Sequence, residues 1–527
     1  PGIFFLVHIM WFHHRAWHHV CRRTLLTMSR PRQTFRKDTI NPSILEVEYA
    51  VRGEIPTKAA EYERRLETGE KLPFGSIVWT NIGNPQQQPM LGQEPITFWR
   101  QVASLTEYPQ LLDLPAHVRD AMFPTDTQER ARQLLDAFGS VGAYTASKGV
   151  PLVRQHVAEF LAARDGFDED LENIYLTAGA SAGISMLFQV LFRAKRDGIL
   201  IPIPQYPLYS ASVSLLDLVP MHYHLNAEQH WDPSISNIKT QIDEARKNGI
   251  EPRAIIMINP GNPTGNCMTR EQIGNVIRLA YEESLAIFAD EVYQENIYQN
   301  RRPFVSFRQV LMDLKNSSDA TERHISETVE LASFHSISKG MVGECGRRGG
   351  FFVLNNFDRE VEGQINKIAS IGLCPPVQGQ IGVDLMVRPP KPGDPSYELW
   401  NSQMQSIFQT LNKRSRRIAE SLTKLPGIEA DPAMGAMYVF PRVHLPKSVA
   451  EEAQRNGKKV DEFYCRKLLD ETGICVVPGS GFGYEPEALD DGSTYSYFRT
   501  TVLAKETQAF IDRFTAFHVA WMKKHKD

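Results

Sequence analysis

The sequence predicts an α/β protein in which a large, mostly parallel sheet flanked by helices is joined to a smaller α+β domain. In the middle of the chain, short apolar runs alternate with amphipathic stretches of helical period, as parallel strands connected by helices do. Polar clusters follow the ends of these runs, where α/β sheets bind ligands. Beyond a proline-rich stretch at 389–393, long helical patterns and fewer strand-like runs indicate a second domain.

The elements of the middle part can be placed in order along the chain. Ile184, Leu187 and Leu191 recur at helical spacing, and a second amphipathic helix is expected over residues 270–283. The expected strands are short apolar runs bounded by turn-forming residues, at 173–177, 198–203, 254–258, 285–289 and 330–334. These elements form the core of the predicted sheet.

Further elements are expected on either side. Pro56 is well placed to open a helix that ends near Gly69, because proline is common in the first helical turn. Long helical patterns cover 399–425 and 506–524, and strand-like runs cover 435–443 and 473–477. The chain is too long for one hydrophobic core. We expect a leader at 1–40, a segment at 41–110 that contributes to the small domain, a large domain at 111–388 and a C-terminal small domain at 389–527.

The composition is that of a globular protein without a strong charge imbalance. The 527 residues are 42% hydrophobic and 23% charged, with a formal net charge of −4. This balance does not favour nucleic-acid binding, and no apolar run reaches the roughly 20 residues that cross a bilayer, so we expect neither a nucleic acid nor a membrane as partner. The six cysteines include no CxxC pair, which argues against a metal site and favours a reducing compartment.

The N-terminal stretch differs from the rest of the chain. Residues 1–37 contain seven arginines and lysines, five histidines and no acidic residue. Such a leader is typical of a mitochondrial transit peptide, which predicts the mitochondrial matrix. The alternative is translated upstream sequence with Met28 as the true start, which predicts the cytoplasm.

Residues 331–352 carry the first chemical signal. A strand-like run is followed there by hydroxyls, a lysine, several glycines and two arginines. Serine hydroxyls, glycine N–H groups and an arginine fork together suit an anionic phosphate. Lys339 supplies a nucleophilic amine beside it, which indicates an aldehyde cofactor, above all pyridoxal 5'-phosphate. The alternative is a solvated lysine in a surface loop.

Two short motifs admit a serine enzyme instead. Residues 179–183 match GxSxG, the nucleophile elbow of α/β-hydrolases, with Ser181 as the nucleophile. Glycines and a hydroxyl at a helix N-terminus also hold phosphate, and the HGGG-type oxyanion segment is missing from the sequence, so we favour phosphate. Ser336 and Lys339 match the SxxK motif of β-lactamases, but the SDN and KTG motifs that accompany it are missing.

Asp290 and Arg499 are further candidates. Asp290 ends an apolar strand, where it is either a cap or ion-pair partner, or a ligand-binding carboxylate. Beside a pyridine ring, a carboxylate keeps the ring nitrogen protonated, which makes the ring an electron sink. Tyr293 and Asn262 could reach the ring oxygen of such a cofactor. Arg499 is either a surface arginine or a bidentate clamp for a substrate carboxylate.

Several motifs, taken in order, resemble the fold type I aminotransferases. They are Asn262-Pro-Thr-Gly, Asp290-Glu-Val-Tyr293, Ser336-Ile-Ser-Lys339 and Arg348-Gly-Gly. Longer segments are similar to the alanine aminotransferase family, among them NPSILEVEYAVRGEI at 41–55, LIPIPQYPLYSA at 200–211, INPGNPTG at 258–265 and GAMYVFP at 435–441. The resemblance extends from about residue 40 to the C-terminus.

The resemblance implies a mostly parallel seven-stranded sheet, pyridoxal 5'-phosphate as cofactor and a role for each matching residue. Lys339 would bind the cofactor covalently and act as the catalytic base, and Asp290 would pair with the pyridine nitrogen. The implied ring contacts are Tyr206, Asn262 and Tyr293; the implied phosphate ligands are Ala180, Ser181, Ser336 and Arg348; the implied substrate ligands are Gly83 and Arg499. Tyr144 would reach the phosphate of the other subunit in a homodimer with shared sites.

Two positions are ambiguous. Arg348 is preferred to Arg347 because it directly precedes Gly349 and Gly350, as in the family's RGG pattern. Ala182 stands where the family pattern has an aspartate, which leaves the phosphate-loop contacts less well defined.

The implied activity is a ping-pong transfer of the amino group of L-alanine to 2-oxoglutarate, giving pyruvate and L-glutamate. Another pyridoxal-phosphate-dependent aminotransferase or a lyase would share the cofactor residues. A serine hydrolase would use Ser181, and a non-catalytic regulator on this fold would need a DNA-binding domain larger than the leader. The preference for alanine rests on the resemblance alone.

Overall fold

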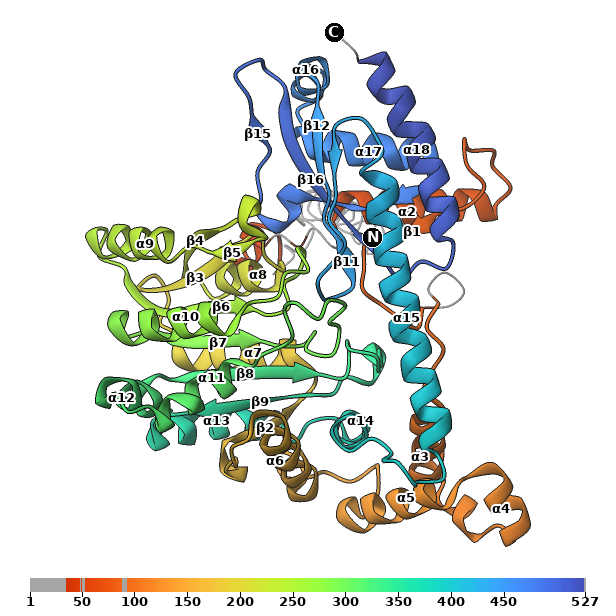
Figure 1. Ribbon diagram of the computed structural model, residues 1–527, viewed down its shortest axis with the longest axis vertical. Coiled ribbons are helices and arrows are strands. Elements are labelled where there is room, and N and C mark those ends of the chain that lie inside the picture. The colour runs from red at the N-terminus through yellow and green to blue at the C-terminus, as the bar shows by residue number, and fades with distance from the viewer. Residues whose placement is uncertain (1–34, 48, 50–52, 88–91, 526–527) are drawn as a thin grey trace, which may run out of the picture. The chain divides into compact units, whose positions relative to one another are not determined.

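The computed structural model describes residues 35–47, 49, 53–87 and 92–525, and it separates the chain into two units, 1–46 and 47–527. The described part of the first unit contains a 3-10 helix at Pro42–Glu46. Residues 1–34 of the predicted leader lie outside the described residues. All remaining elements belong to the second unit (Figure 1).

A mixed eight-stranded sheet forms the centre of the second unit, in the order β2-β9-β8-β7-β6-β3-β4-β5 (Figure 1). Strands β8, β7, β6, β3 and β4 are parallel, whereas β9 is antiparallel to both of its neighbours and β5 is antiparallel to β4. The bounds are β2 Ile174–Thr177, β3 Asp197–Ile203, β4 Val219–Asn226, β5 Asp232–Pro233, β6 Glu251–Ile258, β7 Ala286–Asp290, β8 Leu331–Ser336 and β9 Gly350–Asn355. The predicted mostly parallel sheet is confirmed, and the two-residue β5 adds an eighth strand at its edge.

Helices cover both faces of this sheet because its apolar side chains alternate. Ile199 and Ile201 of β3 pack on one face with α7, α8 and α13, whereas Leu200 packs on the other face with α9, α10 and α11. The bounds of these helices are α7 Ala180–Leu191, α8 Leu208–Leu215, α9 Ile235–Lys247, α10 Arg270–Glu283, α11 Phe307–Asp313 and α13 Arg359–Ile371. Helix α10 has the predicted bounds, and a capping box of Thr269 and Gln272 fixes its start.

The helices at the β2–β9 end of the sheet form a separate apolar cluster. Phe98 and Trp99 of α3 pack there with α5, α6 and α14. The bounds are α3 Thr97–Glu107, α5 Thr125–Phe138, α6 Pro151–Asp165 and α14 Val377–Val387, and α4 Ala116–Met122 lies between α3 and α5 in the chain. Helix α12 (Ala320–Thr328) packs instead, through Ile325, in the cluster that contains α10 and α11.

A second sheet is antiparallel and contains six strands, of which β16 is the longest. Its strand order is β10-β12-β16-β11, and β14 and β15 also pair with β16. Its strands are β10 Ile428–Glu429, β11 Tyr438–Val439, β12 Arg442–Leu445, β14 Val477–Pro478, β15 Glu487–Ala488 and β16 Thr494–Thr501. The helices that share its core are α2 Glu54–Glu67, α15 Tyr397–Leu422, α16 Lys447–Arg455, α17 Val460–Thr472 and α18 Thr507–Lys524. The predicted smaller α+β part is thereby confirmed, while the exact domain boundaries stay a prediction.

A pair of two-residue strands joins segments far apart in sequence. β1 (Val78–Trp79) runs parallel to β13 (Ile474–Cys475), which brings the turn after β1 beside the second sheet. The parallel register of the first sheet aligns Ile258 at the end of β6 with Asp290 at the end of β7. Strand ends and turns from both sheets therefore surround one space. None of the described helices is long and apolar enough to cross a membrane.

Candidate active site

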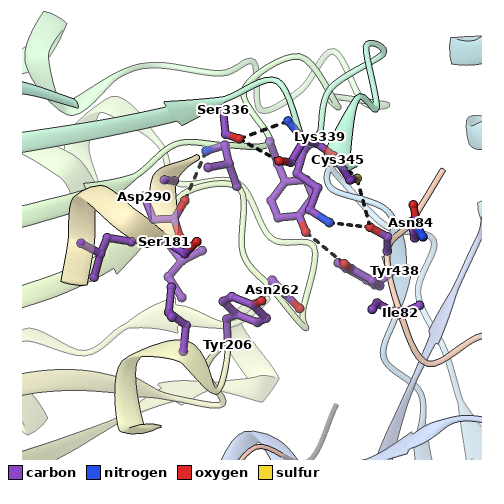
Figure 2. A pocket seen from close by; sticks show the side chains of 18 of the residues that line it. Ile82, Asn84, Ser181, Tyr206, Asn262, Asp290, Ser336, Lys339, Cys345 and Tyr438 are labelled. Carbon is purple, nitrogen blue, oxygen red and sulfur yellow. Dashed lines mark hydrogen bonds between the residues drawn. The ribbon is translucent and has the colours of Figure 1, made fainter. Parts of the chain in front are cut away.

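The carboxyl ends of β6, β7 and β8 open onto a cavity of about 430 Å³ (Figure 2). Every predicted site residue except Tyr144 lines this cavity: Gly83, Ala180, Ser181, Tyr206, Asn262, Asp290, Tyr293, Ser336, Lys339, Arg348 and Arg499. In Figure 2, Lys339 and Tyr438 lie across the cavity from Ser181 and Asp290. Residues from loops and strand ends that are far apart in the sequence thus meet at one place, at the carboxyl edge where α/β sheets bind ligands.

Lys339 lies in the turn that follows β8. Its Nζ donates a hydrogen bond to the carbonyl oxygen of Gly83 at 2.6 Å. A Cβ atom at Gly83 would lie 2.3 Å from Tyr438 Oη and 3.1 Å from Lys339 Nζ. The Tyr438 hydroxyl can lie this close to the backbone at residue 83 only because that residue is a glycine.

Asp290 presents a buried carboxylate to the same cavity. Its residue surface is 6% exposed, Oδ2 accepts a hydrogen bond from Tyr209 Oη at 2.7 Å, and Oδ1 accepts one from Val292 N at 3.3 Å. Burial raises the pKa of Asp290, and the Tyr209 hydroxyl opposes that rise. Within the part of the chain that the structure describes, Asp290 forms no salt bridge. A cationic group in the cavity would therefore meet an unpaired carboxylate.

The start of α7 is suited to bind an anion. Ala180 and Ser181 occupy the first turn, where backbone N–H groups lack helical partners. Arg348 Nη2 donates to Ser181 Oγ at 3.3 Å and to the Ala178 carbonyl at 2.9 Å. Arg347 does not line the cavity and instead pairs with Glu344 at 3.1 Å.

Serine hydroxyls from the β8 side reach the same end of the cavity. Ser336 Oγ hydrogen-bonds to Ser338 Oγ at 3.0 Å, and both serines line the cavity. Gly179, with φ of +86°, leaves room for the guanidinium, because a Cβ there would lie 2.5 Å from Arg348 Nη2. Helix N–H groups, hydroxyls and a guanidinium together form a donor set suited to a phosphate.

Arg499 reaches the cavity from β16 of the second sheet. It is 1% exposed, and its guanidinium lies between the rings of Tyr438 and Phe482, at 4.1 and 4.8 Å from their centroids. Nη1 donates to Asn262 Oδ1 at 2.8 Å, and Nη2 donates to the Asn81 carbonyl. Among the described residues, the buried Nε has no hydrogen-bond partner. The guanidinium is thus fixed in direction and keeps donor capacity for an anionic ligand.

Two tyrosine pairs complete the walls. Tyr49 Oη and Tyr206 Oη lie 2.6 Å apart, and Tyr293 Oη and Tyr438 Oη lie 3.0 Å apart. Burial by itself would raise the pKa of Tyr438, but the charges of Lys339 and Arg499 and the hydrogen bond with Tyr293 together lower that pKa. The buried Arg499 and the half-buried Lys339 therefore polarise the Tyr438 phenol.

The serine-hydrolase alternative finds no support in this geometry. Ser181 Oγ is hydrogen-bonded to Arg348. No histidine is found among the described residues that line the cavity, and the Lys339 amine is hydrogen-bonded to the Gly83 carbonyl instead of to Ser181, so no base activates this hydroxyl.

Comparison with known proteins decides the family. The model of the aminotransferases of class I and II matches residues 115–516. The chain belongs to the class I and II aminotransferase family. It is 43% identical to alanine aminotransferase 2 of Xenopus laevis over 93% of this chain and 87% of that protein. It is also 43% identical to a probable mitochondrial alanine aminotransferase of Dictyostelium discoideum, over 93% of this chain and 90% of that protein.

The fold of this aminotransferase is shared by solved structures. An alanine aminotransferase from Pyrococcus furiosus superposes with a TM-score of 0.67 at 22% identity, over 91% of this chain and all of the other. This likeness confirms the fold type I arrangement of the two sheets.

Aminotransferases of this family use pyridoxal 5'-phosphate, and the cavity fits it. The buried Asp290 carboxylate, without a cationic partner in the described part of the chain, suits a protonated ring nitrogen. The start of α7 with Arg348 suits the phosphate, and the Lys339 amine suits the aldehyde.

The sequence patterns missed several residues of this aminotransferase site. Tyr49, Tyr438 and Cys345 line the cavity, and Tyr209 hydrogen-bonds to Asp290. Tyr438 lies within GAMYVFP and Tyr209 within LIPIPQYPLYSA. Both segments resemble the family, but the sequence did not indicate the roles of these two tyrosines. Tyr144 lies outside the cavity and is 79% exposed. Its expected contact with a second subunit stays a prediction.

Proposed function

We propose that this aminotransferase transfers the amino group of L-alanine to 2-oxoglutarate, giving pyruvate and L-glutamate, in a ping-pong reaction. The observation that carries the proposal is the similarity, along most of the chain, to proteins named alanine aminotransferase. The convergence of Lys339, Asp290 and Arg499 on one cavity supports it.

Lys339 and Asp290 perform the chemical steps in this proposal. Pyridoxal 5'-phosphate, when bound, supplies an aldehyde that takes up the amino group and a ring that accepts the electron pair left on the substrate α-carbon. Lys339 would hold the cofactor through Nζ and, once the substrate amine has taken its place, the free Nζ would accept the proton of the substrate α-carbon. Asp290 would keep the ring nitrogen charged, since an adjacent carboxylate favours the protonated form.

The remaining site residues position the reactants. Arg499 binds the substrate α-carboxylate together with the backbone at Gly83, because its guanidinium is held in one direction and offers a fork. Tyr206 would cover one face of the cofactor ring, and Asn262 and Tyr293 would bind its ring oxygen. The phosphate ligands would be Ala180, Ser181, Ser336 and Arg348.

The decisive variant is Lys339→Ala, assayed with a panel of amino acids and oxo acids that includes glyoxylate. We expect wild-type protein to prefer L-alanine with 2-oxoglutarate and the variant to have no measurable turnover. Retained alanine–oxoglutarate activity in the variant would disprove the role of Lys339. A wild-type preference for another pair, or lyase products, would assign a different reaction to the same cofactor site.

The proposed assembly is a homodimer in which Tyr144 of one subunit reaches the phosphate of the other. Exposed apolar side chains in the same region support a subunit contact: Ile371 is 75% and Leu373 53% exposed, and Ser147 Oγ donates to the Leu373 carbonyl at 2.9 Å. Sedimentation should give twice the mass of the chain, and Tyr144→Phe should weaken cofactor binding. A monomer with full activity would contradict this arrangement.

We propose that the enzyme lies in the mitochondrial matrix, which the stretch 1–37 without an acidic residue supports; the name of one relative, from Dictyostelium discoideum, calls that protein mitochondrial. Residues 1–40 fused to a fluorescent protein should be imported into mitochondria. Cytoplasmic fluorescence from the fusion would favour translation from Met28.

A further inference from the structure

Tyr209 is a buried residue of α8 whose hydroxyl is directed at Asp290. It is 1% exposed, and its Oη donates to Asp290 Oδ2 at 2.7 Å. Tyr209 is not among the described residues that line the cavity. Any effect that it has on the reaction must therefore pass through Asp290.

The Tyr209 hydroxyl is the main hydrogen-bond donor to the Asp290 carboxylate. Its other hydrogen bond, from Val292 N, is longer at 3.3 Å. Its register neighbours in the sheet, Ile258 and Phe334, are apolar. Burial raises the pKa of Asp290, and the Tyr209 hydroxyl opposes the rise more than Val292 N or the charge of Lys339 does.

Packing alone does not explain a tyrosine at this position. The ring of Tyr209 belongs to the apolar cluster between α7, α8 and the sheet, together with Ile184 and Ile201. A phenylalanine would fill the same space, so the hydroxyl is accounted for by Asp290 rather than by the core. The backbone N–H of Tyr209 also bonds to the carbonyl of Tyr206, which lines the cavity. Tyr206, which lines the cavity, and Tyr209, which hydrogen-bonds to Asp290, thus lie in the same turn of the chain.

We propose that Tyr209 is a positioning residue that holds the Asp290 carboxylate ionised and in one orientation toward the pyridine nitrogen of the cofactor. This inference rests on the proposed role of Asp290. Without the hydroxyl, the carboxylate keeps one backbone donor and competes with the ring nitrogen for the proton. The charged ring is then less stabilised, and both cofactor affinity and turnover fall.

The experiment compares Tyr209→Phe with Tyr223→Phe. Tyr223 is an equally buried tyrosine whose Oη donates to the Ile256 carbonyl at 2.8 Å, and it is not among the described cavity-lining residues. The dissociation constant of pyridoxal 5'-phosphate is measured on each apoenzyme by titration. We expect Tyr209→Phe to raise it about tenfold, as the loss of one charge-assisted hydrogen bond predicts, and Tyr223→Phe to change it less than about twofold.

A double-mutant cycle separates positioning from a general loss of structure. In an Asp290→Asn background, Tyr209→Phe should change the dissociation constant less than about twofold, because the carboxylate through which it acts is gone. The acid limb of the affinity–pH profile should also move to higher pH in Tyr209→Phe, since Asp290 becomes easier to protonate.

Three outcomes would overturn the inference. The first is an equal dissociation constant of pyridoxal 5'-phosphate for Tyr209→Phe and Tyr223→Phe. The second is a tenfold effect of Tyr209→Phe on that constant that persists in the Asp290→Asn background. The third is an Asp290→Asn variant that binds the cofactor as tightly as the wild type does. These titrations contain no amino-acid substrate, so they test Tyr209 even if L-alanine proves not to be the substrate.

Discussion

Replacing Arg499 by lysine tests how the substrate carboxylate is recognised. Lysine keeps the positive charge but loses the planar fork. In the structure, the guanidinium lies between Tyr438 and Phe482 and is tied at its edges to Asn262 and the Asn81 carbonyl. An ammonium group can neither stack between the two rings in this way nor present two parallel donors to a carboxylate.

The expected loss can be worked out from these contacts. A hydrogen bond to a charged group contributes about 1.5–3 kcal/mol, and a bidentate pair has two of them. Loss of one to two such bonds in the transition state costs about 1.5–6 kcal/mol, which lowers kcat/KM by roughly 10- to 10⁴-fold. Because Arg499 is 1% exposed and its contacts are screened little by water, we expect at least about a hundredfold loss.

The assay measures kcat/KM for L-alanine and, separately, the dissociation constant of the cofactor. Arg442→Lys is the control: Arg442 lies on β12 of the same sheet, pairs with Glu228 and Glu429 at the surface, and is not among the described residues that line the cavity. The control should keep kcat/KM within about twofold. A wild-type kcat/KM for Arg499→Lys, or an equal loss in both variants, would refute the carboxylate clamp.

Two further variants test close packing and burial. Gly83→Ala would place Cβ 2.3 Å from Tyr438 Oη and 3.1 Å from Lys339 Nζ, so kcat/KM should fall about ten- to hundredfold. Gly75→Ala is the control, because a Cβ there meets no atom within 4 Å, and its kcat/KM should match that of the wild type. Equal kcat/KM values for the two variants would contradict the close packing at Gly83. Burial raises the pKa of Glu291 to about 7 in the folded protein. The protonated side chain therefore stabilises the folded state at low pH, and this stability is lost as the pH rises through about 7 and the buried carboxyl ionises. In urea denaturation, the unfolding free energy of Glu291→Gln relative to wild type should therefore rise by about 1–3 kcal/mol between about pH 5 and about pH 8, and a pH-independent difference would contradict the assignment.

Local sequence patterns were sufficient for much of the fold. The helix at 270–283 was predicted with its observed bounds from its amphipathic pattern, and the structure adds a capping box at its start. The strands β4 and β9 were not predicted. β4 carries a proline and two exposed histidines, His222 and His224, so it lacks a continuous apolar run. β9 begins at Gly350 directly after a glycine-rich loop, and its antiparallel place between β2 and β8 depends on pairings distant in sequence.

Site residues that follow the ends of strands could be predicted from the sequence. Site residues whose positions depend on tertiary packing could not. Asp290 and Lys339 stand out because a charged group after an apolar strand is conspicuous, and the sheet topology brings such ends together. Tyr438 belongs to a two-residue strand of the other sheet, and the Tyr209 hydroxyl points at Asp290 only because α8 packs on the first sheet. No periodicity in the sequence encodes the direction of a buried hydroxyl.

The absorbance spectrum of the purified protein, recorded before and after L-alanine is added, tests the central claim most directly. A cofactor held covalently by Lys339 gives a band beyond the protein absorbance. We expect L-alanine to change this band, 2-oxoglutarate to restore it, and Lys339→Ala to lack it. A colourless protein labelled at Ser181 by a fluorophosphonate probe, or a band that L-alanine leaves unchanged, would contradict the proposed function.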